Sequence, residues 1–193
     1  MRIIKPSEKE IFKYLKKWDS LESYVLQESS LRKLFTKTYP KNNDLDEVLI
    51  KVCSLNDFYS TNIFSPFKVA KHIVKLNIDK KLKQGDLDIV NKIAVVRMKK
   101  NIKKNFYSFA TKYCSHHKPK DYPIYDYFVE KMLMYFKKLD GFSTFKKDDL
   151  KKYDRFKTIL IDFQKHYGLK KFNLKQIDQY LWLAGKKYFP KKY

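Results

Sequence analysis

The sequence predicts an all-α fold, and three observations support this prediction. Apolar residues recur at helical spacing along most of the 193 residues, capping signals precede many of these segments, and sustained alternation of apolar and polar residues is absent. Only four glycines are present, too few for hairpin-rich sheets or for the glycine-rich loops that bind nucleotide cofactors. We expect one helical domain, residues 1–193, with about nine helices, room for two subdomains and no cofactor.

The first helices follow from local signals. Ser7 and Glu10 form a capping box for a helix that ends at Trp18. Short helical segments are expected around Leu21–Gln27 and Ser30–Thr36, where apolar residues keep a helical period for only a few positions.

The next helices begin at clear capping residues. Asp44 with Glu47 opens a helix whose buried side includes a cysteine, and Ser65-Pro66 places an N-cap and a proline at the start of another. Asp86 is the expected cap of a helix over Leu87–Met98.

Four further segments complete the chain. After the basic segment Lys99–Lys104 comes a helix rich in aromatic and ionisable residues, followed by a crossing that contains two prolines. Helices are then expected at Asp126–Lys138, at Asp148–His166 and after the capping pair Asn173 and Gln176.

The formal net charge of +22, from 43 Lys+Arg against 21 Asp+Glu, favours a polyanionic partner. We expect double-stranded DNA, bound by a monomer. Only four of these cations are arginine, so drift of an AT-rich genome toward lysine codons is an alternative explanation of the charge. Because the basic residues are spread along the chain, no membrane partner is expected.

Cys53 and Cys114 lie far apart among apolar neighbours, and we expect both to be reduced thiols in the core of a cytoplasmic protein. The first residues lack the apolar centre of a signal peptide, and no run approaches the roughly 18 apolar residues of a spanning helix. No Cys or acidic side chain stands at the spacing of a zinc site, so no metal is expected.

Ionisable residues gather between residues 103 and 130. Ser108, Lys112 and His116 stand at positions i, i+4 and i+8, which places them on one face of a helix. The chain after Pro119 and Pro123 brings Asp126 to the start of the next helix. This layout predicts that a nucleophile and a carboxylate share a cleft.

Two segments carry a family resemblance: Lys104–Ala110 reads KNFYSFA, and Pro123–Val129 reads PIYDYFV. Their order resembles that in the helix-hairpin-helix DNA glycosylases, most closely the 8-oxoguanine glycosylase branch. In that family a G-x-G-x-K-x-A hairpin grips a phosphate and supplies an attacking lysine, and a P-V-D-x-x-V segment supplies the essential aspartate. The similarity spans residues 55–136, with residues 1–54 and 137–193 as flanking helices of the same unit.

The resemblance implies roles for particular residues, with two departures. Lys104 and Phe106 replace the two hairpin glycines, and Ser108 stands where the family has its lysine, one helical turn before Lys112. The implied catalytic residues are Asp126 and Lys112. The implied DNA-binding residues are Lys103, Lys104, Asn62 and Ser108, and the implied base pocket contains Tyr107, Tyr125 and His116.

The chemistry of glycosidic bond cleavage explains the need for a carboxylate and an amine. Cleavage of an N-glycosidic bond builds positive charge on the sugar, which a carboxylate stabilises, and an amine that attacks the sugar forms a Schiff base. Asp126 alone therefore predicts a monofunctional glycosylase, and Asp126 with Lys112 predicts one with lyase activity.

Each residue also has a simpler interpretation. Asp126 is a suitable N-cap, Lys112 an ordinary exposed helix residue, and Asn62 an ordinary turn residue. His116 and His117 stand where a helix C-terminus favours a cation, and the aromatic residues suit a core. The alternative functions are a non-catalytic DNA-binding protein with the glycosylase fold and a helical protein-interaction domain.

Overall fold

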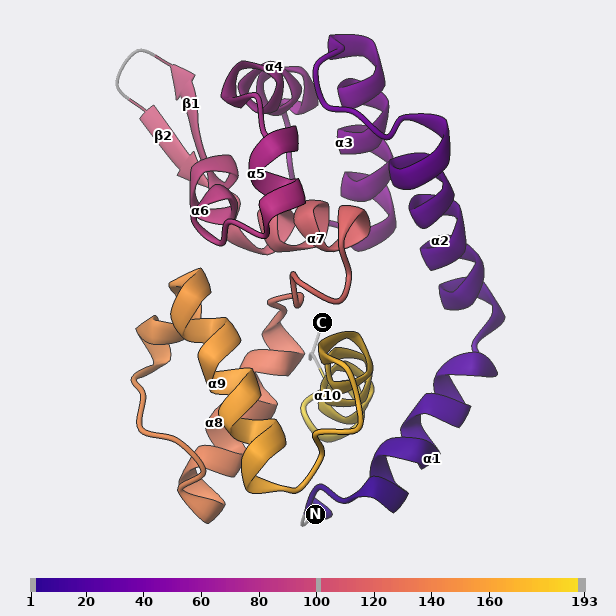
Figure 1. The fold of residues 1–193 in the computed structure, drawn as a ribbon, viewed down its shortest axis with the longest axis vertical. Helices are drawn as coiled ribbons and strands as arrows, with labels where there is room; N and C mark the ends of the chain where they lie inside the picture. Colours follow the sequence, from indigo (N-terminus) through magenta and orange to yellow (C-terminus); the bar gives the residue numbers. More distant parts are fainter. Residues whose placement is uncertain (1–2, 100–101, 191–193) are drawn as a thin grey trace. The chain divides into compact units, whose positions relative to one another are not determined.

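The computed structural model describes residues 3–99 and 102–190, and in that part the protein is mostly helical (Figure 1). The chain forms two compact units. One is the continuous segment Leu26–Tyr122, and the other combines the residues up to Val25 with those from Pro123 onward. These boundaries differ from those of the 55–136 core segment, which remains a prediction.

The described residues contain ten α-helices, a π-helical turn, a 3-10 turn and one two-stranded sheet, which confirms a mostly helical protein. In chain order the elements are α1 (Glu8–Asp19), α2 (Glu22–Lys33), η1 (Leu34–Thr38), α3 (Leu45–Tyr59), α4 (Pro66–Leu76), α5 (Asp79–Gln84), α6 (Asp88–Ala94), β1 (Val95–Lys99), β2 (Ile102–Asn105), α7 (Tyr107–His117), α8 (Tyr127–Asp140), η2 (Lys147–Lys151), α9 (Tyr153–His166) and α10 (Leu174–Tyr188).

The predicted capping residues begin their helices. The side chain of Ser7 accepts from the backbone N–H of Glu10, and that of Asp44 accepts from two N–H groups in the first turn of α3. Asn173 and Gln176 form the expected reciprocal capping box of α10. Each cap satisfies N–H groups that have no partner within the helix, so these starts are fixed by local chemistry.

Four sequence predictions about helices and cysteines are wrong. The helix predicted over Asp148–His166 is divided into η2 and α9, because Lys152 between them has an extended backbone with φ −104° and ψ 114°. The short helices at 21–27 and 30–36 are not separate: residues 22–33 form one continuous helix, α2, in which the hydroxyl of Ser29 donates to the carbonyl of Leu26, and residues 34–36 continue into η1. The helix predicted over Leu87–Met98 ends at Ala94, where β-branched Val95 and Val96 enter a strand.

Cys53 is the fourth correction. It is exposed, because the buried side of α3 passes through Val48, Val52 and Leu55, and Cys53 points away from it. Cys114 is fully buried, as expected, and burial raises the pKa of its thiol.

Strands β1 and β2 form an antiparallel ribbon that connects α6 to α7, and these two helices pack against each other. Phe106 closes the ribbon, since its N–H donates to the carbonyl of Ala94 at 2.8 Å. Val96 is buried beneath the ribbon, whereas Arg97 is exposed, so the two faces of β1 differ. The ribbon also lies against α4 (Figure 1).

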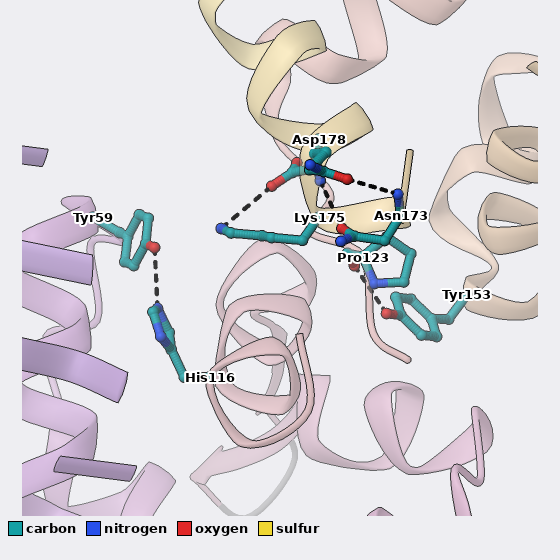
Figure 2. Close-up of polar contacts among 8 residues, drawn as sticks. Tyr59, His116, Pro123, Tyr153, Asn173, Lys175 and Asp178 are labelled. Atoms are coloured by element: carbon teal, nitrogen blue, oxygen red, sulfur yellow. Dashed lines mark hydrogen bonds and ion pairs between the residues drawn. The ribbon is translucent and has the colours of Figure 1, made fainter. Parts of the chain in front are cut away.

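In the other unit, α10 packs on α1 and α8. Gly185 lies directly on Phe128 of α8. The hydroxyl of Tyr153 donates to the carbonyl of Pro123 at 2.9 Å, which holds the segment before α8 to α9 (Figure 2). Within residues 3–99 and 102–190, no helix has both the length and the apolar character that crossing a membrane requires.

Candidate functional site

The face predicted on α7 exists, and Tyr59 of α3 lies against it. The Nζ of Lys112 donates to Ser108 Oγ at 2.5 Å and lies 5.2 Å from the centre of the Tyr59 ring. The Tyr59 hydroxyl lies 3.0 Å from Nε2 of His116 (Figure 2). Tyr59, the last residue of α3, thus contacts both Lys112 and His116 of α7.

Lys112 is not the exposed residue of the simpler interpretation, since it is only 3% exposed. An ammonium group in such a position loses most of its hydration and needs polar partners in return. The Ser108 hydroxyl is one such partner, and the face of an aromatic ring adds a cation–π attraction of about 1–2 kcal/mol when desolvated.

A second polar cluster supports the other side of α7 and is centred on buried Asn42. Lys51, fully buried, donates to the carbonyls of Tyr39 and Lys41 and to Asn42 Oδ1, at 3.0, 2.6 and 2.7 Å. The Asn42 amide donates to Asp79 Oδ1 at 2.6 Å. Burial lowers the pKa of Lys51 to about 8.

The cluster around Asn42 also holds α7. The Tyr113 hydroxyl donates to Asn42 Oδ1 at 2.5 Å, and Nε2 of His117 lies 3.2 Å from the same oxygen. Desolvation, with nearby Lys51, lowers the pKa of His117 to about 3, so this residue is neutral at pH 7. The interpretation of His117 as a cation at the helix C-terminus is therefore wrong.

Asp126 caps α8, as its position in the sequence predicts. Its Oδ1 accepts from the N–H of Phe128 at 2.8 Å. Neighbouring Tyr125 is buried, and its hydroxyl donates to Glu130, which together with burial raises the pKa of Tyr125. Asp126 and Tyr125 belong to one unit and Lys112 belongs to the other. The shared cleft predicted for Asp126 and Lys112 therefore stays a prediction.

The sequence interpretation missed Asp178, a buried carboxylate of the unit that contains Asp126. Asp178 is 5% exposed, and its Oδ2 lies 3.8 Å from Nζ of Lys175 (Figure 2). A signal for it exists, because Asp178 stands four residues after Leu174 and one after Ile177, on the apolar side of α10.

An aromatic cluster in the same unit was also missed. Trp18, Tyr24 and Trp182 have ring centres 5.1–6.2 Å apart, and Phe128, two residues after Asp126, reaches Trp182 at 6.4 Å. The Nζ of Lys186 lies 4.7 Å from the Trp182 ring centre. These residues are far apart in the chain, so only the fold brings them together.

The remaining predicted DNA-binding residues are on the surface. Lys103 and Lys104 are exposed on β2. Asn62 is exposed with a positive φ of 57°, in a loop that the side chain of Asn56 holds through the N–H of Ile63 at 2.9 Å. Tyr107, predicted for the base pocket, is buried in the first turn of α7.

The segment aligned with the glycosylase hairpin has a different backbone. Lys104 and Asn105 are in strand β2, and Phe106 precedes α7 with φ −101° and ψ 51°. None of these residues has the positive φ for which glycine is used. In the described part of the chain, no group of three or more His, Cys, Asp and Glu side chains is arranged to hold a metal ion.

Comparison with known proteins adds two matches. Residues 10–121 match a family model described as HI_0787_N, N-terminal domain. A protein of Haemophilus influenzae, described only as an uncharacterized protein, is 51% identical over 148 residues, which cover 76% of this chain and 70% of the relative. No solved structure gives a significant match.

Proposed function

The chain belongs to the HI_0787_N N-terminal domain family, and we propose that it recognises damaged bases in double-stranded DNA and cleaves their N-glycosidic bond. The proposal assigns it a helix-hairpin-helix glycosylase type of fold and an oxidised or otherwise modified purine as substrate. It rests on the sequence resemblance and on one structural observation, the position of the Lys112 ammonium.

In this proposal, the position of the Lys112 ammonium offsets the shift of the lysine by one helical turn relative to the family motif. In the resemblance, Ser108 occupies the place of the attacking lysine, and Lys112 starts one turn later, about 5.4 Å along the helix axis. The side chain of Lys112 reaches back over this turn and places its Nζ 2.5 Å from Ser108 Oγ. The contact of the Lys112 amine with Ser108 supports the proposal that Lys112 takes the role of the family lysine, and the burial of Lys112 favours a role other than solubility.

Asp126 is assigned the carboxylate role. As the N-cap of α8 it is held in place by a hydrogen bond from the N–H of Phe128 at 2.8 Å. An ionised carboxylate stabilises the charge that develops on the sugar. Since Asp126 and Lys112 belong to different units, their roles are tested by separate substitutions.

A second candidate is a non-catalytic DNA-binding protein, and the backbone of Lys104–Phe106 favours it. The family hairpin offers backbone N–H groups to a phosphate, whereas those of β2 follow an extended strand. In this alternative the exposed lysines of the ribbon hold DNA and no bond is broken.

The deciding experiment incubates the protein with a duplex that carries one 8-oxoguanine opposite cytosine, with and without borohydride. Base release and covalent trapping are read on a denaturing gel. We expect trapping by the unaltered protein and its loss in Lys112→Arg, which keeps the cation but forms no Schiff base under these conditions. Base release without trapping would limit the mechanism to Asp126 and water. No release from a panel of modified bases would favour the second candidate.

A further inference from the structure

A basic groove lies between α4 and the β1–β2 ribbon, and of the residues predicted to bind DNA it includes Lys103. It has a volume of about 790 Å³, and five of its ten lining residues are cations: Lys68, Lys71, Lys75, Arg97 and Lys103. No carboxylate lines it. Lys112 and Ser108 are not among its residues, so the groove is a separate feature of the same unit.

Helix α4 supplies one wall through its periodicity. Lys68, Lys71 and Lys75 stand at i, i+3 and i+7, which aligns them along one side over about 10 Å of helix. The opposite side of α4 is buried, so the helix cannot turn the face that carries these lysines away from the groove.

Two hydrogen bonds fix this wall to its surroundings. The Nζ of Lys68 donates to the carbonyl of Met98 on β1 at 2.5 Å, and Nε2 of His72 donates to the carbonyl of Lys92 on α6 at 2.8 Å. Helix α4 and the ribbon therefore keep the groove open at a defined width, which lowers the ordering cost of binding.

The opposite wall, formed by the β1–β2 ribbon, carries a pair of like charges that destabilises the folded protein. Arg97 and Lys103 are direct partners in the antiparallel ladder, so two like charges face each other on the exposed side of the ribbon. Such a pair destabilises a sheet. Among the described residues, none of the five groove cations forms an ion pair with a carboxylate. An anion in the groove would relieve this repulsion.

Exposed aromatic side chains indicate which polyanion fits. Phe67, which lines the groove, is 54% exposed, and Phe64, in the loop before α4, is 93% exposed. Bases of a single strand present their faces for stacking on such rings, whereas the bases of a duplex are already stacked. A row of cations beside exposed rings is the combination used for single strands.

We propose that this groove binds a single-stranded segment of DNA, with its phosphates on the five cations and a base stacked on Phe67. The choice of DNA rests on the proposed function above, whereas the single-strand chemistry rests on the groove itself. The groove thus gives the protein a second contact with nucleic acid that is independent of Lys112.

The test measures fluorescence anisotropy of a labelled 12-nucleotide DNA strand over a range of salt concentrations. We expect the double variant Lys71→Ala with Arg97→Ala to weaken binding at least tenfold and to make the slope of log K against log salt shallower by about 1.4, since two phosphate contacts are lost. Phe67→Ala should weaken binding about tenfold while leaving the slope unchanged.

The matched control is Arg32→Ala with Lys37→Ala, which removes the same two residue types at exposed positions of the same unit. Its affinity and slope should remain those of the unaltered protein, and circular dichroism should show equal folding of all variants. Equal losses of affinity in the control and the groove variant would overturn the proposal. So would polyglutamate that competes with the labelled strand as well as unlabelled DNA does, or RNA that binds more tightly than DNA.

The 8-oxoguanine assay separates this proposal from the proposed function. Groove-dependent strand binding without base release would leave the groove assignment standing and reject the glycosylase. If the protein releases the base, and substitution of Lys71, Arg97 and Phe67 leaves its affinity for the strand unchanged, the glycosylase proposal stands and the groove assignment is rejected.

Discussion

Gly185 of α10 packs against Phe128 of α8 so closely that a β-carbon at position 185 would lie 2.6 Å from Cβ of Phe128. That approach is shorter than any normal carbon contact, and the atoms it meets belong to the backbone and to the base of a side chain, which cannot move aside. The contact fixes the first turn of α8, which Asp126 caps.

Gly185→Ala should therefore lower the free energy of unfolding by about 1–3 kcal/mol, because α10 must move away from α8. Chemical denaturation gives this value, and Lys187→Ala, at an exposed position of the same helix, is the control. A Gly185→Ala protein with unaltered stability would mean that the two helices separate at little cost.

Asp126→Asn should abolish base release while leaving duplex affinity within about twofold of the original, because asparagine caps a helix as well as aspartate does. A loss of more than about 100-fold in the single-turnover rate is expected for a group that stabilises transition-state charge. Asp178→Asn, which alters a buried carboxylate of the same unit, is the comparison. If only Asp178→Asn removes activity, the carboxylate role belongs to Asp178.

Lys103→Ala with Lys104→Ala should weaken binding to any duplex and make the salt slope shallower by about 1.8, as two phosphate contacts are lost. Filter binding at several salt concentrations measures both quantities. Lys33→Ala with Lys37→Ala removes two exposed lysines from the same unit and should leave the slope as it was. A slope that is equal in all proteins would place the duplex surface elsewhere.

His117 makes stability depend on pH. Its pKa is about 3 in the folded protein and about 6.5 in an unfolded chain. Below pH 6.5 the unfolded chain binds a proton that the folded protein does not, so stability falls as the pH falls from 6.5 toward 3. Between pH 7 and pH 5 we expect a loss of about 1–2 kcal/mol from this residue.

The His117→Gln variant keeps a donor for Asn42 Oδ1 but does not titrate, so its loss between pH 7 and pH 5 should be smaller by that amount. Urea denaturation at the two pH values provides the measurement. Equal losses in both proteins would show that the imidazole gains its proton without unfolding.

The parts of the fold that sequence could predict are those fixed within a few residues. The caps at Ser7, Asp44, Asp126 and Asn173 satisfy N–H groups two or three positions later, so their signal is local. Strands β1 and β2 depend on each other, and a short segment such as VVRMK suits a helix until its partner is known.

The candidate site likewise combines features that local sequence predicts with features that only the fold creates. The common face of Ser108, Lys112 and His116 follows from helical spacing, but Tyr59, which contacts Lys112 and His116, lies more than fifty residues earlier in the chain, on α3. Lys51 was missed for another reason. It lies three residues after Val48 on the buried side of α3, and only the carbonyls of Tyr39 and Lys41 explain a lysine there.

The division of the chain at Val25 and Pro123 has a consequence during synthesis. The ribosome completes the continuous segment Leu26–Tyr122 before it makes any of α8, α9 and α10. Helix α1 emerges first, yet its packing partner α10 emerges last, so Ile11 and Tyr14 stay without their final neighbours for about 160 residues of translation. At roughly 5–20 residues per second this wait lasts about 8–30 s, during which the apolar side of α1 lacks its final packing partner and is open to chaperone binding and misassembly.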